Sequence, residues 1–392
     1  MRPGKGYLVN IMKYLINFRF LTELGLTQNG LRKSGVLAAG IIIAAMIPAA
    51  SAQTGPAPKV PESGLINPKA VAFNPASGKV YSVDRDGGAV YVSDDAANST
   101  VRVKVGTAPV SVAVDSVNGK AYVANAGDGT ASVIDGKTNE VSATLQVGSH
   151  PYSIAANSTA GKIYVARTYS DQVIIIDAVS NAVSGVKTGS ADLIAIDSKA
   201  DKTYLLGYEG GNLAVLSGEK NNLNKSTVGM HAWGMALNEV TGDLYVAKPG
   251  NAEVALLKSG SLAPTFAPTG QIPCAVAVNS RTNTVYVANY GDNTVTVVNG
   301  ADGKSVATVP VGNRPQAIAV SAEENLVLVA NTLGNSVTVI DGNTDRVLAT
   351  IDAGKVPYAL AVNTVSGMLH VANNDKKAFT ILDLSRFRKQ LR

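Results

Sequence analysis

The sequence predicts an all-β protein built from eight copies of a four-stranded antiparallel unit, because three patterns recur along it with one period. A tyrosine-centred motif, Lys-x-Tyr-Val-x in its commonest form, returns every 40 to 42 residues. An alanine within a short apolar run, and a turn residue between that run and the motif, return at the same intervals. A period near 41 residues with four short strands per repeat is typical of a β-propeller blade.

The motif and the alanine each occur eight times, which indicates eight repeat units. The motif position holds Tyr81, Tyr122, Tyr164, Tyr204, Tyr245, Tyr286, Leu328 and His370, and the alanines are Ala72, Ala113, Ala155, Ala195, Ala236, Ala277, Ala319 and Ala361. The turn position holds Gly78, Gly119, Gly161, Asp201, Gly242, Asn283, Asn325 and Gly367. These residue types tolerate a positive φ, as hairpin turns require. We therefore expect eight blades.

Each unit contains four short apolar runs, as in SIAAN, KIYVA, QVIII and AVSGV of residues 153–186. β-Branched and aromatic residues alternate there with small or polar ones, which indicates strands. The eighth unit supplies only three such runs before a basic tail at residues 386–392. We expect residues 57–64 to supply its missing outermost strand and so to close the ring with an N-terminal strand.

Three strings resemble the YVTN-repeat β-propeller family, which includes exported bacterial propellers and surface-layer repeat domains. They are YVANAGDGTASVIDG at 122–136, YVANYGDNTVTVVNG at 286–300 and LVANTLGNSVTVIDG at 328–342. The resemblance covers residues 57–385. It implies a propeller, with seven blades more often than eight, so seven blades is the alternative to our count. It implies no particular function, because one fold serves many.

The N-terminal segment predicts an export signal. Two basic residues, Arg32 and Lys33, precede an apolar run at 35–47, and an Ala-Ser-Ala triplet ends at Ala52. This order is that of a cleavable signal peptide. The run is shorter than the roughly 20 residues that a helix needs to span a bilayer. We expect cleavage after Ala52, so that the exported chain begins at Gln53.

Cleavage there divides the chain into a signal peptide at 1–52, a single propeller domain at 53–385 and the basic tail at 386–392. The expected location is periplasmic or secreted, with no transmembrane span after cleavage. Two alternatives stay open: translation starts at the internal Met12, or the leader is retained as an anchor.

Charge and composition exclude several classes of function. The leader holds six basic residues and one acidic residue; 34 minus 6 leaves 28 basic residues, and 29 minus 1 leaves 28 acidic ones. The chain after the leader therefore has a formal net charge of zero. This value argues against a nucleic acid partner. The one cysteine, Cys274, excludes an intrachain disulfide and is expected to be an inert, partly buried thiol. Three histidines are too few for a multi-copper centre.

Eight residues are predicted to line one mouth of the ring's channel and to bind a ligand. They stand at three repeat positions: His150, His231 and Arg314 before the inner strand, Tyr152, Asp192 and Trp233 two residues later, and Arg167 and Lys248 at the end of the motif strand. Polar and aromatic groups that converge on a concave surface are typical of ligand sites. Arg167 and Lys248 favour an anionic ligand. Variable, exposed loops are the alternative explanation.

Asparagine stands at the end of the motif strand in four units, and we expect its side chain to bond local turn backbone. Acidic turns such as Gly-Asp-Gly-Thr lack the dense set of ligands that calcium needs. His370, in place of the repeat tyrosine, is expected to serve packing.

The sequence contains no nucleophile elbow, no P-loop and no dinucleotide-binding glycine motif between a strand and a helix. We therefore expect an exported binding or scaffold protein, a monomer, that recognises a protein, peptide, glycan or small anionic ligand. The alternative is a lactonase-like or lyase-like propeller enzyme that uses His150, His231 and Asp192 with a divalent metal. No cofactor is expected, because no ligand motif supports that metal.

Overall fold

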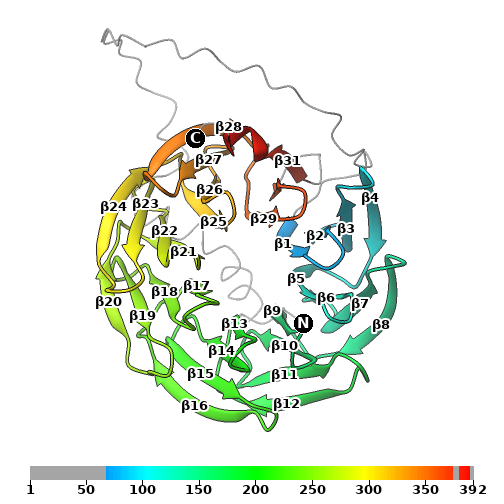
Figure 1. The fold of residues 1–392 in the computed structure, drawn as a ribbon. Helices are drawn as coiled ribbons and strands as arrows, with labels where there is room; N and C mark the ends of the chain where they lie inside the picture. Colours follow the sequence, from blue (N-terminus) through cyan, green and yellow to red (C-terminus); the bar gives the residue numbers. More distant parts are fainter. Residues whose placement is uncertain (1–67, 374–378, 389–392) are drawn as a thin grey trace, which may run out of the picture. The chain divides into compact units, whose positions relative to one another are not determined.

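A computed structural model describes residues 68–373 and 379–388, and in these ranges eight antiparallel sheets are arranged in a ring (Figure 1). The prediction of an all-β propeller with eight blades is confirmed, and the alternative of seven is wrong. Seven of the sheets have four strands, and the eighth has three among the described residues. The predicted leader and the predicted closing strand at 57–64 lie outside the described ranges.

Blades 1 to 4 each use four consecutive strands, with the first nearest the centre of the ring (Figure 1). They are β1 (Pro68–Asn74), β2 (Lys79–Asp84), β3 (Ala89–Asp94) and β4 (Ser99–Lys104); β5 (Pro109–Asp115), β6 (Lys120–Asn125), β7 (Thr130–Asp135) and β8 (Glu140–Gln146); β9 (Pro151–Asn157), β10 (Lys162–Arg167), β11 (Gln172–Asp177) and β12 (Val183–Lys187); and β13 (Leu193–Asp197), β14 (Lys202–Leu206), β15 (Asn212–Ser217) and β16 (Asn222–Thr227).

Blades 5 to 8 follow the same order, and a short helix comes after the last described strand. They are β17 (Gly234–Leu237), β18 (Leu244–Lys248), β19 (Glu253–Leu257) and β20 (Thr265–Pro268); β21 (Pro273–Asn279), β22 (Thr284–Asn289), β23 (Thr294–Asn299) and β24 (Ser305–Pro310); β25 (Pro315–Ser321), β26 (Leu326–Asn331), β27 (Ser336–Asp341) and β28 (Arg346–Asp352); and β29 (Ala359–Asn363), β30 (Met368–Ala372), β31 (Phe379–Asp383) and α3 (Ser385–Arg388).

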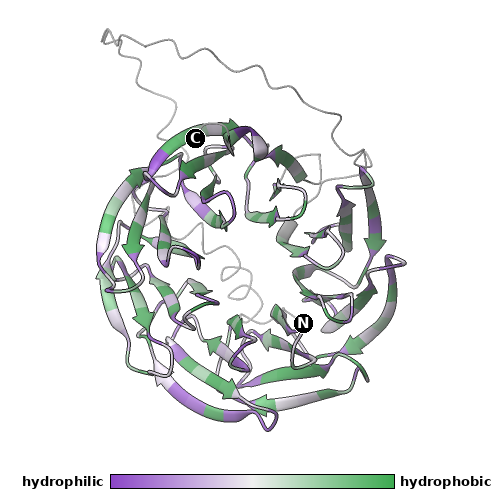
Figure 2. Cartoon of the chain, viewed as in Figure 1, coloured by the Kyte–Doolittle hydropathy of each residue, from purple (hydrophilic) through white to green (hydrophobic). Residues whose placement is uncertain are grey.

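The middle strands of each blade are buried on both faces, because every blade packs between two neighbours. In β6, Ala121 and Val123 pack toward blade 1, whereas Tyr122 and Ala124 pack toward blade 3. Burial on both faces explains why these strands have nearly continuous apolar sequences. Hydrophobic residues accordingly recur along the strands of all the blades (Figure 2).

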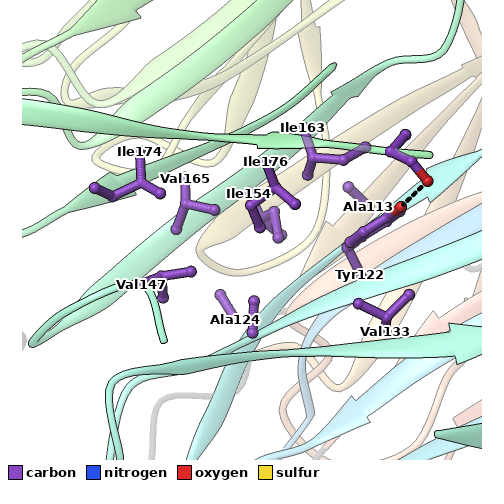
Figure 3. Close-up of a cluster of buried hydrophobic side chains, with 12 residues drawn as sticks. Ala113, Tyr122, Ala124, Val133, Val147, Ile154, Ile163, Val165, Ile174 and Ile176 are labelled. Atoms are coloured by element: carbon purple, nitrogen blue, oxygen red, sulfur yellow. Dashed lines mark hydrogen bonds between the residues drawn. The ribbon is translucent and has the colours of Figure 1, made fainter. Parts of the chain in front are cut away.

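Hydrophobic clusters fill the junctions between neighbouring blades. The cluster between blades 2 and 3 includes Tyr122, Ile154, Ile163 and Ile176 (Figure 3). Full burial of each such apolar side chain contributes about 1.5 to 3 kcal/mol. The Tyr122 hydroxyl donates a hydrogen bond across the junction to the carbonyl of Ala178, at 3.4 Å. A tyrosine of this repeat position therefore both fills a junction and links two blades.

Strand register explains why the repeat alanine and the tyrosine-centred motif recur with the same period. Each repeat alanine lies directly opposite the motif residue of its own blade, as Ala113 lies opposite Tyr122 and Ala236 opposite Tyr245. A small residue opposite a large ring leaves room for that ring on the shared face of the sheet. All eight predicted turn residues have a positive φ, between 47° and 74°. The predicted turns are therefore confirmed.

Blade 8 packs against blade 1, with β29 beside β1, so the inner strands form a closed circle. Phe387 of α3 is buried and packs with Leu384 in the cluster between blades 7 and 8. The first residues after the predicted domain boundary at 385 thus contribute to the propeller core.

Candidate functional site

The predicted site residues all lie on one face of the ring. In an antiparallel four-stranded blade, the turn between strands two and three and the loop that leaves strand four are at the same end of the sheet. We call this end of the ring the mouth face. Backbone hydrogen bonds join its two sets of loops, for example from Thr168 N to His150 O at 3.0 Å and from Thr332 N to Arg314 O at 2.9 Å.

The residue before the inner strand has a left-handed backbone at six of the blades. Its φ is 48° to 60° in Ala108, His150, His231, Ile272, Arg314 and Val356. A β-branched residue is strained in this region, yet Ile272 and Val356 adopt it. The ring therefore imposes this conformation whatever the side chain, and at His150 and His231 the side chain is exposed on the mouth face.

Two residues later, the start of the inner strand bulges in several blades. Tyr152 and Cys274 are each skipped in the pairing with the second strand. A bulge redirects the side chain that it carries. Tyr152 is 46% exposed, whereas the Cys274 sulfur lies 3.2 Å from the carbonyl oxygen of Pro315. Cys274 is a free, partly buried thiol, as expected, and burial raises its pKa to about 12, which disfavours the reactive thiolate.

Three predicted site residues come together where blade 4 meets blade 5. Tyr208, in the turn between β14 and β15, stacks on Trp233 with ring centroids 6.1 Å apart and 24° between the ring planes. His231 meets the same tyrosine edge-on, with centroids 6.3 Å apart. The Asp192 carboxylate accepts the Tyr208 N–H at 2.8 Å. We call these four residues, with Glu209, the acidic aromatic cluster.

The environment of Asp192 raises the pKa of its carboxyl group. Burial raises its pKa, the hydrogen bond from Tyr208 lowers it, and the neighbouring charge of Glu209 raises it again; the result lies above the ordinary value. The influence of Glu209 on Asp192 also indicates that the two carboxylates share one region of the mouth face. His231 and Glu209 are exposed, whereas Trp233 and Tyr208 are partly buried.

Two more of the predicted residues pair with tyrosines at other blade junctions. His150 meets Tyr169 edge-on, with ring centroids 6.5 Å apart. The Arg314 guanidinium lies 4.8 Å from the ring centroid of Tyr290, and it donates a hydrogen bond to the Tyr290 carbonyl at 3.0 Å. Each pair is local to its own junction, so the predicted residues form several small groups around the mouth face.

Sequence reasoning missed the tyrosines Tyr169, Tyr208 and Tyr290. A signal for them was present, because each stands one or two positions after the end of the motif strand, in the turn that leads to strand three. Their contacts with His150, His231 and Arg314 form only when the fold places this turn beside the loop that enters the next blade.

Arg167 and Lys248, the two cations predicted to attract an anion, are engaged within the protein. Lys248 is 5% exposed, and its Nζ lies 2.7 Å from Glu253 Oε1 and 4.6 Å from the ring centroid of Phe266. Arg167 donates a hydrogen bond to the Ser170 hydroxyl at 2.9 Å. The positive charge of Lys248 is therefore already neutralised by a partner.

The asparagines at the end of the motif strand bond mainly the hydroxyl side chains of strand three and not the backbone of their own turn; Asn373 in addition donates to the backbone carbonyl of Ala353 at 2.7 Å. Asn125 is fully buried and donates to the hydroxyls of Thr130 and Ser132, at 2.9 and 3.0 Å. Asn289 makes the equivalent pair of bonds to Thr294 and Thr296. The reason is register: this side chain lies opposite the first residue of strand three, so the nearest acceptors are that strand's hydroxyls.

A separate cleft of about 490 Å³ opens on the mouth face between blades 1 and 2. Arg85, Asp86 and Lys104 carry its charges, and glycine backbones form much of its wall. Within residues 68–373 and 379–388, no group of three or more His, Cys, Asp or Glu side chains is placed to share a metal ion. No helix in this part of the chain is long and apolar enough to cross a bilayer.

Comparison with known proteins agrees with the fold. Residues 250–387 match the family model described as YNCE-like beta-propeller. Together with the ring of eight blades, this match confirms the predicted resemblance to the YVTN-repeat propellers. No curated protein matches the chain.

Two solved structures illustrate the similarity of fold. Hydrazine synthase from Kuenenia stuttgartiensis superposes with a TM-score of 0.58 at 17% identity, over 71% of this chain and 96% of that chain. Dihydro-heme d1 dehydrogenase NirN, solved in complex with DHE, superposes with a TM-score of 0.60 at 11% identity, over 74% of this chain and 66% of that chain. Identities this low indicate a shared fold and nothing about chemistry.

Proposed function

We propose that the chain is an exported binding protein that recognises a partner protein, peptide or glycan through its mouth face. The observation that carries the proposal is the acidic aromatic cluster, in which Trp233, Tyr208 and His231 gather at one junction of two blades. Aromatic side chains with a partly exposed surface and a polar edge are enriched at binding sites. The export component rests on the leader sequence at residues 1–52.

The scaffold supports this role because it fixes the loops that carry the cluster. Tyr208 follows β14 and Trp233 precedes β17, and the N–H of Trp233 bonds the carbonyl of Ala247 at 3.0 Å. A second bond joins Ala232 N to the carbonyl of Tyr208 at 3.2 Å. Loops held in this way present their side chains with a smaller ordering cost on binding.

Peptide and glycan arrays probed with the labelled full-length protein test the proposal. We expect the wild type to bind a defined subset of features, and the combined Tyr208→Ala and Trp233→Ala variant to bind that subset at least tenfold more weakly. The matched control is Val240→Ala, because Val240 is 65% exposed in the turn between the first two strands of blade 5, at the opposite end of the sheet. Binding that survives the double substitution contradicts the proposal.

A further inference from the structure

We propose that the acidic aromatic cluster binds an organic cation, that is, an ammonium or guanidinium group, either in a free small molecule or at the tip of a lysine or arginine side chain. This inference rests on the proposed function and names the ligand chemistry of the same site. It departs from the anionic ligand that the sequence favours.

The aromatic part of the cluster supplies an electron-rich surface. Trp233 and Tyr208 are nearly parallel, at 24°, and both remain partly exposed. The face of an aromatic ring carries partial negative charge and attracts cations, most strongly in tryptophan. Because Tyr208 also holds His231 edge-on, three rings stand together at this junction.

The carboxylates of the cluster, Asp192 and Glu209, add negative charge at the same junction. Asp192 is held in place by its 2.8 Å bond from the Tyr208 N–H, so its carboxylate is fixed next to the main chain of the residue that carries one of the stacked rings. Glu209 follows Tyr208 directly in the sequence, and its negative charge contributes to raising the pKa of Asp192. Two carboxylates therefore accompany a single imidazole, that of His231.

Lys248, which approaches the loop that carries His231, adds no uncompensated positive charge to the cluster. It approaches this loop at Gly229, where an added methyl group would lie 3.0 Å from its Nζ. Its charge is neutralised by Glu253 at 2.7 Å. Within the acidic aromatic cluster, an anionic ligand would meet two carboxylates, whereas a cation would meet aromatic rings and carboxylates together.

The chain offers a direct reporter, because Trp233 is the one tryptophan among 392 residues. Tryptophan emission of the full-length protein, excited selectively over that of its 14 tyrosines, therefore reports on this site alone. The cationic probes are tetramethylammonium chloride and arginine amide, and the comparison probes are sodium phosphate and glucose at matched ionic strength. We expect a saturable change in tryptophan emission with the two cations only.

Two substitutions test the role of charge. Asp192→Asn is expected to weaken cation binding about tenfold, which corresponds to about 1.4 kcal/mol. Glu209→Gln, which leaves the Asp192 bond to Tyr208 in place, is expected to weaken it roughly threefold. The matched control is Asp171→Asn, a mouth-face carboxylate with 65% of its side chain exposed in the turn that leads to β11 of blade 3. Melting temperatures verify that each variant folds.

The source of the cation is distinguished by comparing arginine amide with arginine-containing tripeptides. A gain of tenfold or more for a peptide identifies a basic side chain of a partner, and equal affinities identify a free small cation. Emission changes caused by glucose or phosphate and not by the cations overturn the inference while leaving the proposed function intact. Cation affinity unchanged in both Asp192→Asn and Glu209→Gln also overturns it. Failure of the proposed function is registered separately, by array binding that survives loss of the two aromatic rings.

Discussion

His370 illustrates at the level of one residue how the repeat changes where the ring closes. In blades 2 and 5 the tyrosine at this position donates a hydrogen bond to a backbone carbonyl of the next blade, Tyr122 to Ala178 and Tyr245 to Gly300, each at 3.4 Å. His370 is 1% exposed, and its Nε2 lies 3.0 Å from a carboxylate oxygen of Asp95 in blade 1. The last junction thus has a side-chain pair in place of a bond between a tyrosine and a carbonyl.

Asp95 is the centre of a small polar network at this junction. It also accepts hydrogen bonds from Asn363 Nδ2 at 2.6 Å and from Ser366 Oγ at 2.7 Å. The buried apolar cluster described between these two blades consists of Tyr91 and Phe379, far smaller than those at the other junctions. Among the described residues, polar contacts around Asp95 therefore accompany a small apolar cluster at this junction.

Replacing Asp95 by alanine should destabilise the ring and alter its response to acid. The substitution leaves the buried His370 without its carboxylate partner and removes one of the two acceptors of Asn363 Nδ2, at a cost of about 3 kcal/mol. Burial raises the pKa of Asp95, but the bonds and charge of His370 and the bonds from Ser366 and Asn363 lower it further, so the net pKa lies below the ordinary value.

The direction of this shift sets the sign of the pH dependence. A carboxyl whose pKa is depressed in the folded state adds stability above its unfolded-state pKa of about 3.9, and that stability is lost as the pH falls through the folded-state pKa. Urea unfolding at pH 7 and pH 3 should therefore show a smaller loss of stability on acidification for Asp95→Ala than for the wild type. The control is Asp94→Ala, whose partner is an N–H of its own turn. Identical losses for Asp95→Ala and the wild type contradict this prediction.

Some of this residue-scale detail was predictable and some was not. The repeat alignment identifies His370 as a departure from tyrosine, and it predicts an inert Cys274. It does not reveal Asp95 as the partner of His370, because the two lie 275 residues apart and meet only when the ring closes. Tyr208 escaped prediction for a similar reason, since its contact with Trp233 joins a turn of one blade to the loop that enters the next.

At the scale of the blade, a lysine link between neighbours has two arrangements. In blades 1 and 2, the first residue of strand two is a lysine that donates to a carbonyl of the next blade, as Lys79 donates to Gly136 at 2.6 Å. In blade 5 the equivalent residue of the repeat is Asp243, directly before β18, and the lysine is Lys258, directly after β19. Lys258 pairs with Asp243 at 3.0 Å and donates to Gly300 at 2.6 Å. The charges have exchanged places while the link to the next blade is kept.

This exchange predicts that the pair can be reversed. Asp243→Lys alone places two ammonium groups together and removes the acceptor of the Ser259 N–H, so it should destabilise the protein by about 1 to 2 kcal/mol. Adding Lys258→Asp recreates the order found in blade 1 and should restore at least half of the loss. Urea unfolding of both single variants and the double variant measures the coupling. A double variant less stable than either single one contradicts the interpretation.

The inner strand sets a limit on side-chain size. Ala236 lies opposite Tyr245, which is fully buried between blades 5 and 6. Ala236→Leu should therefore overpack the blade and cost about 1 to 3 kcal/mol. Val240→Leu, in the exposed turn after the same strand, is the control and should change stability by less than about 0.5 kcal/mol. Thermal unfolding followed by circular dichroism compares the two, and equal melting temperatures count against the packing argument.

Element boundaries were predictable because they depend on local chemistry, whereas loop contacts depend on the ring. The eight turn residues have the positive φ that their chemistry allows. The repeat alanine and the repeat tyrosine recur together because they are cross-strand partners, as Ala113 and Tyr122 are. The left-handed backbone of Ile272 and Val356 was not predictable, because it runs against the preference of β-branched residues and is imposed by the connection between blades.

At the scale of the whole molecule, the ring depends on how its last blade is completed. Each of the seven other blades covers its third strand with a fourth, so that no third strand is left at an edge. In blade 8, β31 is the outermost strand among the described residues. An unpaired edge presents free N–H and C=O groups that invite pairing with other chains. Residues 57–64, which lie outside the described ranges, remain our candidate for the covering strand, because their sequence resembles the segment that precedes blade 7.

If residues 57–64 cover β31, the two ends of the chain hold the ring closed jointly. Replacing these eight residues in the full chain by a glycine and serine segment of equal length keeps the connection but removes the strand-forming side chains. We expect a lower melting temperature and concentration-dependent association, because the edge of β31 becomes available to a second molecule. The control replaces residues 53–56 in the same way. Since β30 and the Asp95 network still hold blade 8 against blade 1, the variant should remain folded at low temperature. A melting temperature equal to that of the control, with no association on concentration, would show that the eighth blade is stable with three strands.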